Sequence, residues 1–310
     1  MMEHSVNISV NINEISKAYN GTRALEDISL SIGKGELFGL IGPDGAGKTT
    51  LIRILTTLLL PDKGYATVEG YDTVKDYRKI RKIVGYMPGR FSLYQDLSVE
   101  ENLNFFASIF NTSIKENYHL IRDIYQQIEP FKTRPAGKLS GGMKQKLALS
   151  CALIHKPVIL FLDEPTTGVD AVSRKEFWDM LAKLKEEGIT ILVSTPYMDE
   201  AGRCDRVALI QEGKILSVNT PGGIVKSYEN PLLAVKSENM YQLLFDVLEF
   251  EGTIRAYRSG EYIHAAVKKD RQQEEKIERF LAEKGHRFVT AKYITPSVED
   301  SFMALMKIKN

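Results

Sequence analysis

Apolar residues follow different spacings in the first sixty residues, and each spacing predicts a different element. Between Ile28 and Ile32 apolar and polar side chains alternate before Gly33, which is typical of a half-buried strand and its turn. The run 37–41 is nearly all apolar, as in a strand that is covered on both faces. A glycine-rich turn follows, and residues 49–59 then predict a helix. The start of the chain therefore predicts a buried strand, a tight loop and a helix.

The middle of the chain combines a helical segment with strands that alternate with helices. Little strand pattern occurs between residues 98 and 155, where Ser98 and Glu101 form a capping-box pattern that predicts a helix through Phe110. The elements predicted next are a strand at 158–162, a helix at about 172–187, a strand at 189–194 and a hairpin turn at 211–214. This alternation predicts an α/β core around a parallel sheet.

The last eighty residues have a different order of elements. Residues 221–223 and 230–231 are rich in glycine and proline and are expected to form a linker. The elements expected beyond it are strands at 232–236, 253–257, 261–267 and 288–292, with helices at 238–248, 271–284 and 297–307. This βαββαβ order predicts a small α+β domain of ferredoxin-like topology.

Composition and charge exclude several classes of protein. The 310 residues carry 41 Lys and Arg against 40 Asp and Glu, so the net charge is +1 and we expect no nucleic-acid partner. The two cysteines, Cys151 and Cys204, cannot form a disulfide framework and are compatible with a reducing compartment. No signal sequence or run of about 20 apolar residues is present. We expect a cytoplasmic chain that reaches a membrane only through a partner.

A phosphate-binding loop follows the first buried strand. Residues 42–50 match the pattern G-x-x-x-x-G-K-[ST] between a strand and a helix. Backbone amides of such a loop surround phosphates, the lysine contacts the β- and γ-phosphates, and the hydroxyl after it can bind Mg²⁺. The residues expected to bind ATP here are Gly42, Asp44, Gly45, Ala46, Gly47, Lys48, Thr49 and Thr50, with Thr49 also on Mg²⁺.

Two carboxylates end the apolar strand at 158–162. Asp163 and Glu164 follow it directly, and the carboxyl end of a parallel strand faces the ligand crevice. We expect Asp163 to hold Mg²⁺, directly or through water, and Glu164 to polarise the attacking water. Lys48 and Glu164 are therefore the candidate catalytic residues.

The segment 139–143, Leu-Ser-Gly-Gly-Met, extends these motifs to a family resemblance. Residues 6–228 resemble the ATP-binding cassette (ABC) ATPases, whose LSGG signature precedes a helix, here 143–155. In that family the signature binds the γ-phosphate of ATP held by the opposite subunit of a head-to-tail dimer. The resemblance therefore assigns Ser140, Gly141 and Gly142 to a nucleotide on a partner cassette.

The resemblance assigns roles to further single residues. Tyr19 lies where the family stacks an aromatic ring on adenine, and the alternative is a residue on the surface of a strand. Asp170 belongs to Gly168-Val169-Asp170, which resembles the loop that touches the partner's site. Asp44 replaces a residue that is often asparagine in the family, which adds a carboxylate near the dimer contact.

The resemblance also predicts domains and partners. It implies an ATP-binding domain at 6–228 with a helical subdomain at about 90–155 that docks a membrane permease, and an accessory domain at 230–310. The stretches 94–103, 197–201 and 295–302 are most similar to cassettes of ABC-2-type export permeases and to the tail domain of drug and polysaccharide exporters. The alternative for the tail is a structural cap or a support for the dimer. The chain is then expected at the inner face of the cell membrane, held there by its permease.

Two residues depart from the family pattern. Gly89 stands where the family usually has a glutamine that senses Mg²⁺ and water, and glycine supplies no side-chain ligand. Gln95, six residues later, is an alternative source of that amide. Pro196 stands where the family has its switch histidine, and proline offers no hydrogen-bond donor. We expect good Mg-ATP binding with slow turnover.

Three functions are compatible with these features. The first is the ATPase subunit of an ABC-2-type exporter, paired with itself or, more consistently with Gly89 and Pro196, with a second and complete cassette. The second is an ATP-gated clamp that barely hydrolyses ATP and only completes a partner's active site. The third is a soluble ABC protein of translation or DNA repair, but such proteins usually have tandem cassettes or long coiled-coil insertions.

Overall fold

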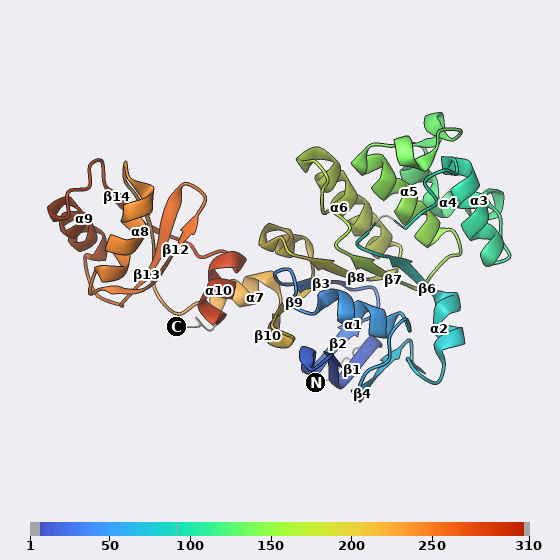
Figure 1. Cartoon of the computed structure of the whole chain (residues 1–310), viewed down its shortest axis with the longest axis horizontal. Helices are drawn as coiled ribbons and strands as arrows, with labels where there is room; N and C mark the ends of the chain where they lie inside the picture. Colours follow the sequence, from blue (N-terminus) through green and yellow to red (C-terminus); the bar gives the residue numbers. More distant parts are fainter. Residues whose placement is uncertain (1–6, 91, 307–310) are drawn as a thin grey trace, which may run out of the picture. The chain divides into compact units, whose positions relative to one another are not determined.

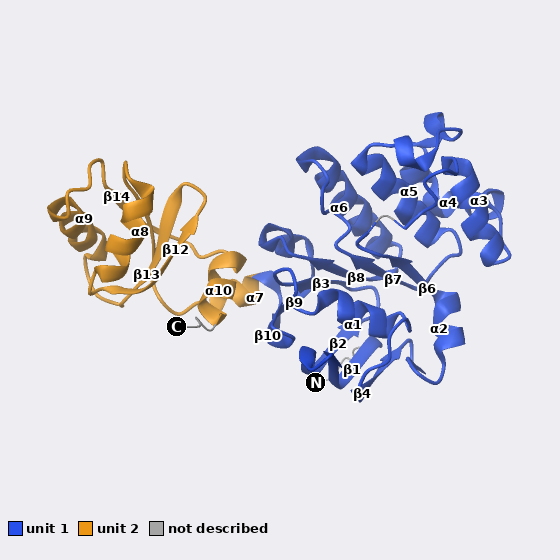
Figure 2. Ribbon diagram, viewed as in Figure 1, with its two compact units in different colours: residues 1–221 blue, residues 222–310 orange. Residues whose placement is uncertain are grey.

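A computed structural model describes residues 7–90 and 92–306 of the chain. The expectation of no signal sequence at residues 1–5, and the expected domain ends at residues 6 and 307–310, lie outside the described residues. The chain divides into two compact units, residues 1–221 and 222–310 (Figure 2). Among the described residues, no helix is both long and apolar enough to cross a membrane.

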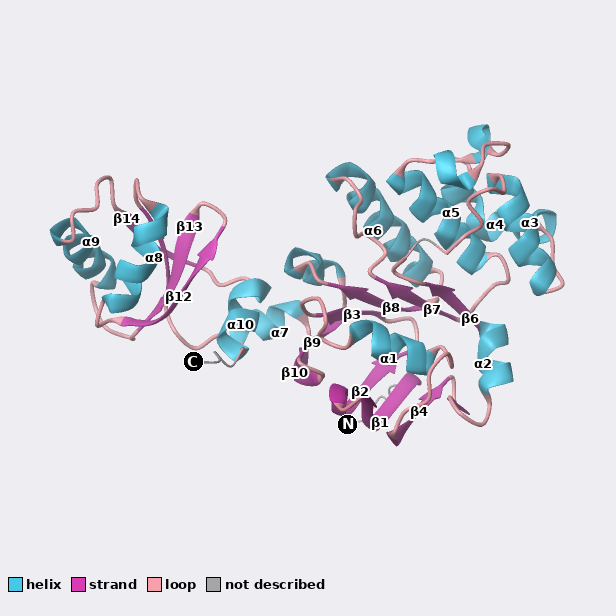
Figure 3. Ribbon diagram, in the orientation of Figure 1, coloured by secondary structure: helices cyan, strands magenta, loops and turns pink. Residues whose placement is uncertain are grey.

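Unit 1 is an α/β structure whose elements are drawn in Figures 1 and 3. Its strands are β1 (Ile8–Tyr19), β2 (Thr22–Gly33), β3 (Leu37–Ile41), β4 (Lys63–Val68), β5 (Tyr71–Asp72), β6 (Val84–Met87), β7 (Ile159–Asp163), β8 (Thr190–Thr195), β9 (Arg206–Gln211) and β10 (Lys214–Asn219). Its helices are α1 (Lys48–Leu55), α2 (Tyr77–Ile83), α3 (Val99–Ile109), α4 (Ile114–Tyr125), α5 (Gly141–Leu153) and α6 (Ala171–Glu186), with short 3₁₀ turns η1 (Glu129–Phe131), η2 (Ala136–Lys138) and η3 (Met198–Arg203).

Two sheets form the core of unit 1. The larger has the order β10-β9-β3-β8-β7-β6, and all neighbours except β10 and β9 run parallel. The smaller is antiparallel with the order β2-β1-β4-β5. The parallel sheet that the alternating elements predicted is confirmed, and so is the hairpin of β9 and β10. This sheet brings the carboxyl ends of β3, β8 and β7 together at one edge.

Helix α1 lies in the apolar layer between the two sheets. Its residues Leu51, Ile52 and Leu55 are fully buried and share one core cluster with residues of both sheets. The helix is shorter than the predicted 49–59, because it ends at Leu55 and Thr57 has a positive φ of 63°. A residue in the left-handed conformation ends an α-helix, and the spacing of apolar residues does not predict where such a residue occurs.

Helices α3, α4 and α5 form the helical subdomain, which Figure 1 shows grouped beyond the β6 side of the sheet. The predicted capping box at the start of α3 is confirmed, because Ser98 accepts from the Glu101 amide and Glu101 accepts from the Ser98 amide. Ser113 and Glu116 form a second capping box at the start of α4. Helix α5 packs on α3, α4, α6 and β6, so it joins the subdomain to the sheet.

Unit 2 has the predicted ferredoxin-like order. Its elements are β11 (Leu232–Lys236), α8 (Met240–Glu249), β12 (Thr253–Ser259), β13 (Tyr262–Val267), α9 (Gln273–Glu283), β14 (Thr290–Ile294) and α10 (Val298–Leu305). The sheet is antiparallel with the order β12-β13-β11-β14, which is the arrangement expected for βαββαβ. One sheet face packs its apolar residues against α8 and α9.

One expectation at the boundary of the units was wrong. Residues 221–223 were expected to form a linker, but they begin helix α7 (Pro221–Lys226). Proline is tolerated in the first turn of a helix because its missing N–H would have no partner there. Ile224 is fully buried, which gives this short helix an apolar anchor.

Helix α10 is attached to unit 2 by one buried carboxylate. Asp300, 2% exposed, accepts from His264 Nδ1 at 2.6 Å, from the hydroxyl of Tyr257 and from Ser297 Oγ at 2.6 Å. Burial raises the pKa of this carboxyl, but the hydrogen bonds from His264, Ser297 and Tyr257 outweigh it and hold the pKa well below its usual range. The carboxylate therefore stays charged and holds α10 on strands β12 and β13.

Replacing this anchor is expected to destabilise unit 2. Asp300→Ala removes the buried acceptor of three hydrogen bonds, from the partly buried Tyr257 and His264 and from the exposed Ser297, a loss of about 2 kcal/mol in unfolding free energy. Chemical denaturation followed by circular dichroism measures it, with the exposed neighbour Glu299→Ala as the matched control. Because the folded pKa is depressed, the stabilisation is present above the ordinary value of 3.8 and is lost as the pH falls below it. Equal stability of both variants at pH 7 would contradict the anchor.

Candidate functional site

Three neighbouring parallel strands end at the candidate site. β3 runs into the loop 42–47, β8 ends at Ser194 and Thr195, and β7 ends at Asp163 with Glu164 next. Ile41 pairs with Thr195 and Asp163 pairs with Ser194, so these ends are level across the sheet. The carboxyl ends of parallel strands form the ligand crevice in open α/β sheets.

The loop needs glycine at two positions. At Gly42, a Cβ would lie 2.0 Å from the carbonyl oxygen of Ile210 in β9. At Gly47, φ is 106° and a Cβ would lie 2.5 Å from the carbonyl oxygen of Ala24 in β2. Both distances are shorter than any van der Waals contact, so neither position accepts a side chain. The loop is therefore compressed between β9 and β2 at the start of α1.

Lys48 is buried among three oxygens. Its Nζ donates to the carbonyls of Gly42 at 2.7 Å and Pro43 at 3.0 Å, and it forms an ion pair with Glu164 Oε1 at 3.0 Å. The lysine side chain is 2% exposed and the glutamate side chain 23%. All three ammonium donors are satisfied, so the two candidate catalytic residues neutralise each other. A phosphate that binds Lys48 must displace the Glu164 carboxylate.

A second set of hydrogen bonds joins the helix α1 to β7 and β8. Thr49 Oγ1 donates to Asp163 Oδ1 at 3.1 Å, and Ser194 Oγ donates to the same oxygen at 2.7 Å. Ser194 Oγ also accepts from the backbone amide of Glu164 at 3.0 Å. Ser194 was not among the residues predicted from the sequence, although a polar residue at the end of the apolar strand 190–195 was the available signal.

The pair Thr49 and Asp163 fits a magnesium ion. Mg²⁺ prefers hard oxygen ligands and usually takes one or two from the protein, leaving the rest to phosphates and water. A hydroxyl and a 3% exposed carboxylate lie 3.1 Å apart here, and carboxylate and hydroxyl oxygens are the donors this ion requires. Within the described residues no cluster of three or more His, Cys, Asp or Glu could hold a metal by itself.

Pro196 follows β8 directly beside these groups. The preceding Thr195 donates its hydroxyl to Glu200, a carboxylate that is 3% exposed and also accepts from Thr166 at 2.9 Å. Thr195 Oγ1 in turn accepts from the amide of Tyr197 at 3.1 Å. The chain around Pro196 is therefore fixed by hydrogen bonds on both sides, yet the residue itself adds no donor.

Gly89 follows β6, next to β7. A Cβ at Gly89 would lie 3.0 Å from the carbonyl oxygen of Asp163 and 3.8 Å from its carboxyl carbon. A side chain at position 89 would therefore lie beside Asp163. The backbone of Asp163 would have to shift by a few tenths of an ångström to make room for it. Gln95, the alternative source of an amide, is exposed and lies against Gly137 of η2 instead. The structure gives that alternative no support.

The signature residues begin α5. Ser140 is exposed and caps the helix by accepting from the Met143 amide at 3.3 Å. A Cβ at Gly142 would lie 2.6 Å from Ser173 Oγ, so α5 approaches α6 more closely than any larger residue allows. The amino end of α5 is thereby held beside the loop that leads into α6, with Gly141 near the carbonyl of Gly168.

The remaining predicted site residues lie further out. Tyr19, 43% exposed, ends β1 at the hairpin whose second strand touches Gly47. Asp44 is exposed on the loop. Asp170 caps α6, and the hydrogen bonds from the Ser173 and Val172 amides hold the pKa of its carboxyl below the usual value. This capping role was not predicted from the sequence.

His155 has a structural role. It stacks on Phe110 with ring centroids 3.7 Å apart, and its Nε2 lies 3.0 Å from the Val84 carbonyl. Burial lowers its pKa, so the ring is neutral at pH 7.

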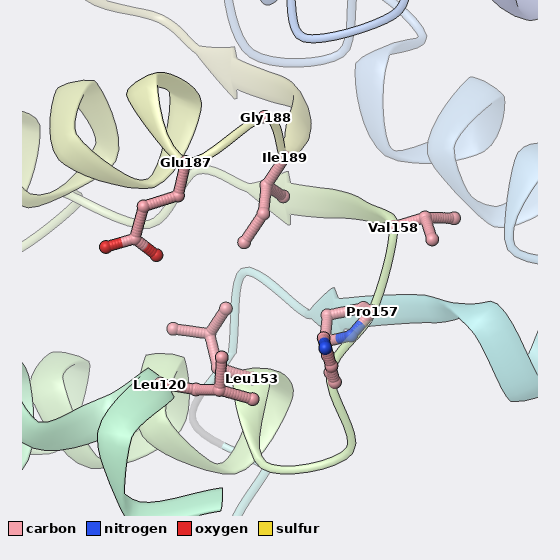
Figure 4. Close-up of a pocket in the computed structure, with 8 residues that line it drawn as sticks. Leu120, Leu153, Pro157, Val158, Glu187, Gly188 and Ile189 are labelled. Atoms are coloured by element: carbon pink, nitrogen blue, oxygen red, sulfur yellow. The ribbon is translucent and has the colours of Figure 1, made fainter.

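A cavity of about 460 Å³ lies at the opposite edge of the sheet (Figure 4). It opens at the amino ends of β7 and β8, where Ile189 points toward Leu120 and Leu153 of the helical subdomain and Val158 points away from them. Its walls are mostly apolar, and Glu187 is the acidic group among them. Phosphates bind at the carboxyl ends of such strands, so this cavity is distinct from the candidate site.

The chain is similar in sequence to known proteins. The family described as "ABC transporter" matches residues 25–167. "Daunorubicin resistance ATP-binding protein DrrA2" of Streptomyces coeruleorubidus is 32% identical over 305 residues, covering 96% of this chain and 94% of that protein.

A second relative is longer. "Probable multidrug ABC transporter ATP-binding protein YbhF" of Escherichia coli is 37% identical over 304 residues, which are 96% of this chain and 52% of that protein. The chain thus spans about half the length of that relative.

A solved structure shares the fold of unit 1. The post-hydrolysis dimer of the ATP-binding cassette MJ0796 with ADP and Pi has a TM-score of 0.62 and 25% identity, and it covers 68% of this chain and 98% of that one.

Proposed function

We propose that this chain, which belongs to the ABC transporter family of ATP-binding proteins, is the nucleotide-binding subunit of an ABC-2-type exporter. The names of DrrA2 and YbhF, a drug-resistance and a multidrug transport protein, support export. The subunit would bind MgATP and use closure and hydrolysis to drive a membrane permease. It would then lie at the inner face of the cell membrane, attached through that permease.

One observation carries the proposal. Lys48 and Thr49 at the start of α1 meet Glu164 and Asp163 at the end of β7, at 3.0 Å and 3.1 Å. A cation, a hydroxyl and two carboxylates within hydrogen-bond reach of a phosphate loop are the groups that phosphoryl transfer to water requires. The proximity of two residue pairs more than a hundred positions apart is difficult to explain otherwise.

Each group then has a role. The amides of 42–50 and Lys48 would bind the phosphates, Tyr19 would stack on adenine, and Thr49 and Asp163 would hold Mg²⁺, which neutralises phosphate charge when bound. Glu164, released from Lys48 by the phosphates, would accept a hydrogen bond from the attacking water and orient it. The hydrogen bonds of Ser194 would keep Asp163 and the backbone of Glu164 in place while the Glu164 side chain moves from Lys48 to the water.

The exposed amino end of α5 would serve a second cassette. Ser140, Gly141 and Gly142 present backbone amides at a helix terminus, which suits a γ-phosphate. In a head-to-tail dimer these residues would complete the partner's site, and Asp170 would contact it. The dimeric ADP-bound structure of MJ0796 supports such an assembly.

Gly89 and Pro196 point to slow turnover at this chain's own site. Removing one positioning donor commonly lowers a rate by about 10²–10³. A glutamine at position 89 would lie beside Asp163, and a histidine at position 196 would directly follow β8. Phosphate binding depends on other residues and should persist. The alternative function, a clamp that closes on ATP and completes only a partner's site, rests on the same two residues.

These departures favour a heterodimer. Two copies of this chain would place two impaired sites together, whereas its intact signature could complete the site of a second cassette that has the glutamine and histidine. We therefore propose a complete cassette as the partner, with self-association as the alternative.

The helical subdomain carries a surface suited to the permease. We call Tyr94, Phe105, Phe106 and Ile109 the aromatic patch. Tyr94, Phe105 and Ile109 are 51%, 37% and 54% exposed. The ring of Phe105 forms edge contacts with the rings of Tyr94 and Phe106, with centroids 4.9 Å and 5.5 Å apart. Exposed aromatic clusters are typical of binding sites for partner proteins. A short apolar helix of the permease would cover the patch.

The central test is steady-state hydrolysis of MgATP, with nucleotide affinity measured in parallel. The wild type is expected to bind ATP and to hydrolyse it slowly, with Glu164→Gln at background. Pro196→His should raise the rate by about tenfold or more, because it restores a donor beside the γ-phosphate. Lys48→Ala is the control for binding. A wild type that does not bind ATP would contradict the proposed function, and an ordinary fast rate would contradict slow turnover.

A mixture with a complete cassette tests the heterodimer. It is expected to hydrolyse ATP about tenfold faster than this chain alone, because the signature completes the partner's site. Ser140→Asp preserves the helix cap but puts a negative charge against the γ-phosphate, so it should abolish the stimulation, whereas Ser140→Asn should retain it. Stimulation that survives Ser140→Asp would show that the signature is not used.

The aromatic patch is tested by co-purification with the permease from membranes. Phe105→Asp is expected to reduce recovery by about tenfold or more, because a charge replaces an interface aromatic residue. The matched control is Phe288→Asp, since Phe288 is 84% exposed on unit 2. ATP affinity should be unchanged in both. Equal recovery of the two variants would place the permease elsewhere.

A further inference from the structure

A second cavity, of about 190 Å³, lies directly beside Glu164. Its walls come from the segment after β6 with Gly89, from one side of α5, and from the loop 164–169. All three belong to unit 1. The cavity therefore adjoins both the candidate catalytic carboxylate and the position that lacks the expected glutamine.

Glu164 needs a hydrogen-bond partner in this cavity. Its Oε1 is held by Lys48, and no described residue donates to its Oε2. Once phosphates draw Lys48 away, Oε1 also loses its partner. A carboxylate that receives a proton from water works only if it is held in the right orientation. Gly89 has no side chain with which to hold it.

Gln145 is the amide that lines this cavity. Gly141, Gln145 and Ala148 all face the cavity, at the spacings of four and three residues that put side chains on one side of a helix. Gln145 is half-buried, and among the described residues no group bonds to its amide. Helix α5 is 13 residues long, capped by Ser140 and packed on α6, so it presents this side chain from a rigid support.

We propose that Gln145 is a positioning residue that supplies, from α5, the amide that Gly89 lacks. Its NH₂ group donates to Glu164 Oε2, directly or through a water in the cavity, and its carbonyl can accept from water. This inference rests on the proposed function. In that reaction the water oxygen bonds to the γ-phosphorus while the bond to the bridging oxygen breaks, the water proton passes by way of Glu164 to the phosphate, and ADP and phosphate leave.

The test is hydrolysis and binding of MgATP by the full chain with Gln145→Met, which keeps length and packing but removes the amide. The expected result is a kcat lowered by about 10- to 100-fold, with KM and ATP affinity changed by less than about twofold and an unchanged melting temperature. Gln145→Asn, which keeps an amide, should restore part of the rate. Gln242→Met, an exposed glutamine of α8, is the matched control.

Several results would overturn the inference: a wild-type kcat in Gln145→Met, a joint fall of affinity and melting temperature, or a fall in kcat in Gln95→Met instead. A wild-type rate no higher than that of Glu164→Gln would also overturn it, since no hydrolysis would remain to assist. The measurement of ATP binding distinguishes failure of this inference from failure of the proposed function. If ATP still binds, the proposed nucleotide-binding function stands without this inference, and if it does not, the proposed function itself fails.

Discussion

The hydroxyl of Ser194 is the contact on which the geometry of the site depends. It lies on β8, between the strand that leads into the phosphate loop and the strand that carries the carboxylates. By donating to Asp163 and accepting from the Glu164 amide, it fixes both residues to the middle strand. Thr49 joins the same carboxylate from α1. The short side chain of Ser194 thus sets the distance between the phosphate loop and the carboxylates. It can reach both carboxylate residues because the parallel register places Ser194 opposite Asp163.

Much of the fold was predictable because it depends on local spacing. The buried strand 37–41, the capping box of Ser98 and Glu101, and the βαββαβ order of the tail are all signals carried within a few residues. The early end of α1 depends on one left-handed residue, Thr57, and the helix at Pro221 depends on the burial of Ile224. Neither property appears in a pattern of apolar positions, because tertiary packing decides both.

The motifs predicted which residues would gather at the site, but not how their side chains pair with one another. The ion pair of Lys48 and Glu164 and the role of Ser194 require the register of three strands, which sequence spacing does not contain. The two departures, Gly89 and Pro196, follow the strands on either side of β7. The glutamine and the histidine that the family usually has are therefore missing on both sides of the carboxylates of β7. A group that compensates for them would have to come from outside the sheet.

The buried pair of Lys48 and Glu164 has a consequence for ligand choice. The lysine already has a negative counterion and two carbonyl acceptors inside the protein, so an incoming anion must compete with all three. A single phosphate group brings little more charge than the carboxylate it displaces, whereas a polyphosphate chain brings several charges that the loop amides also bind. The contacts of Lys48 therefore favour a ligand that brings several negative charges over a small anion that brings one.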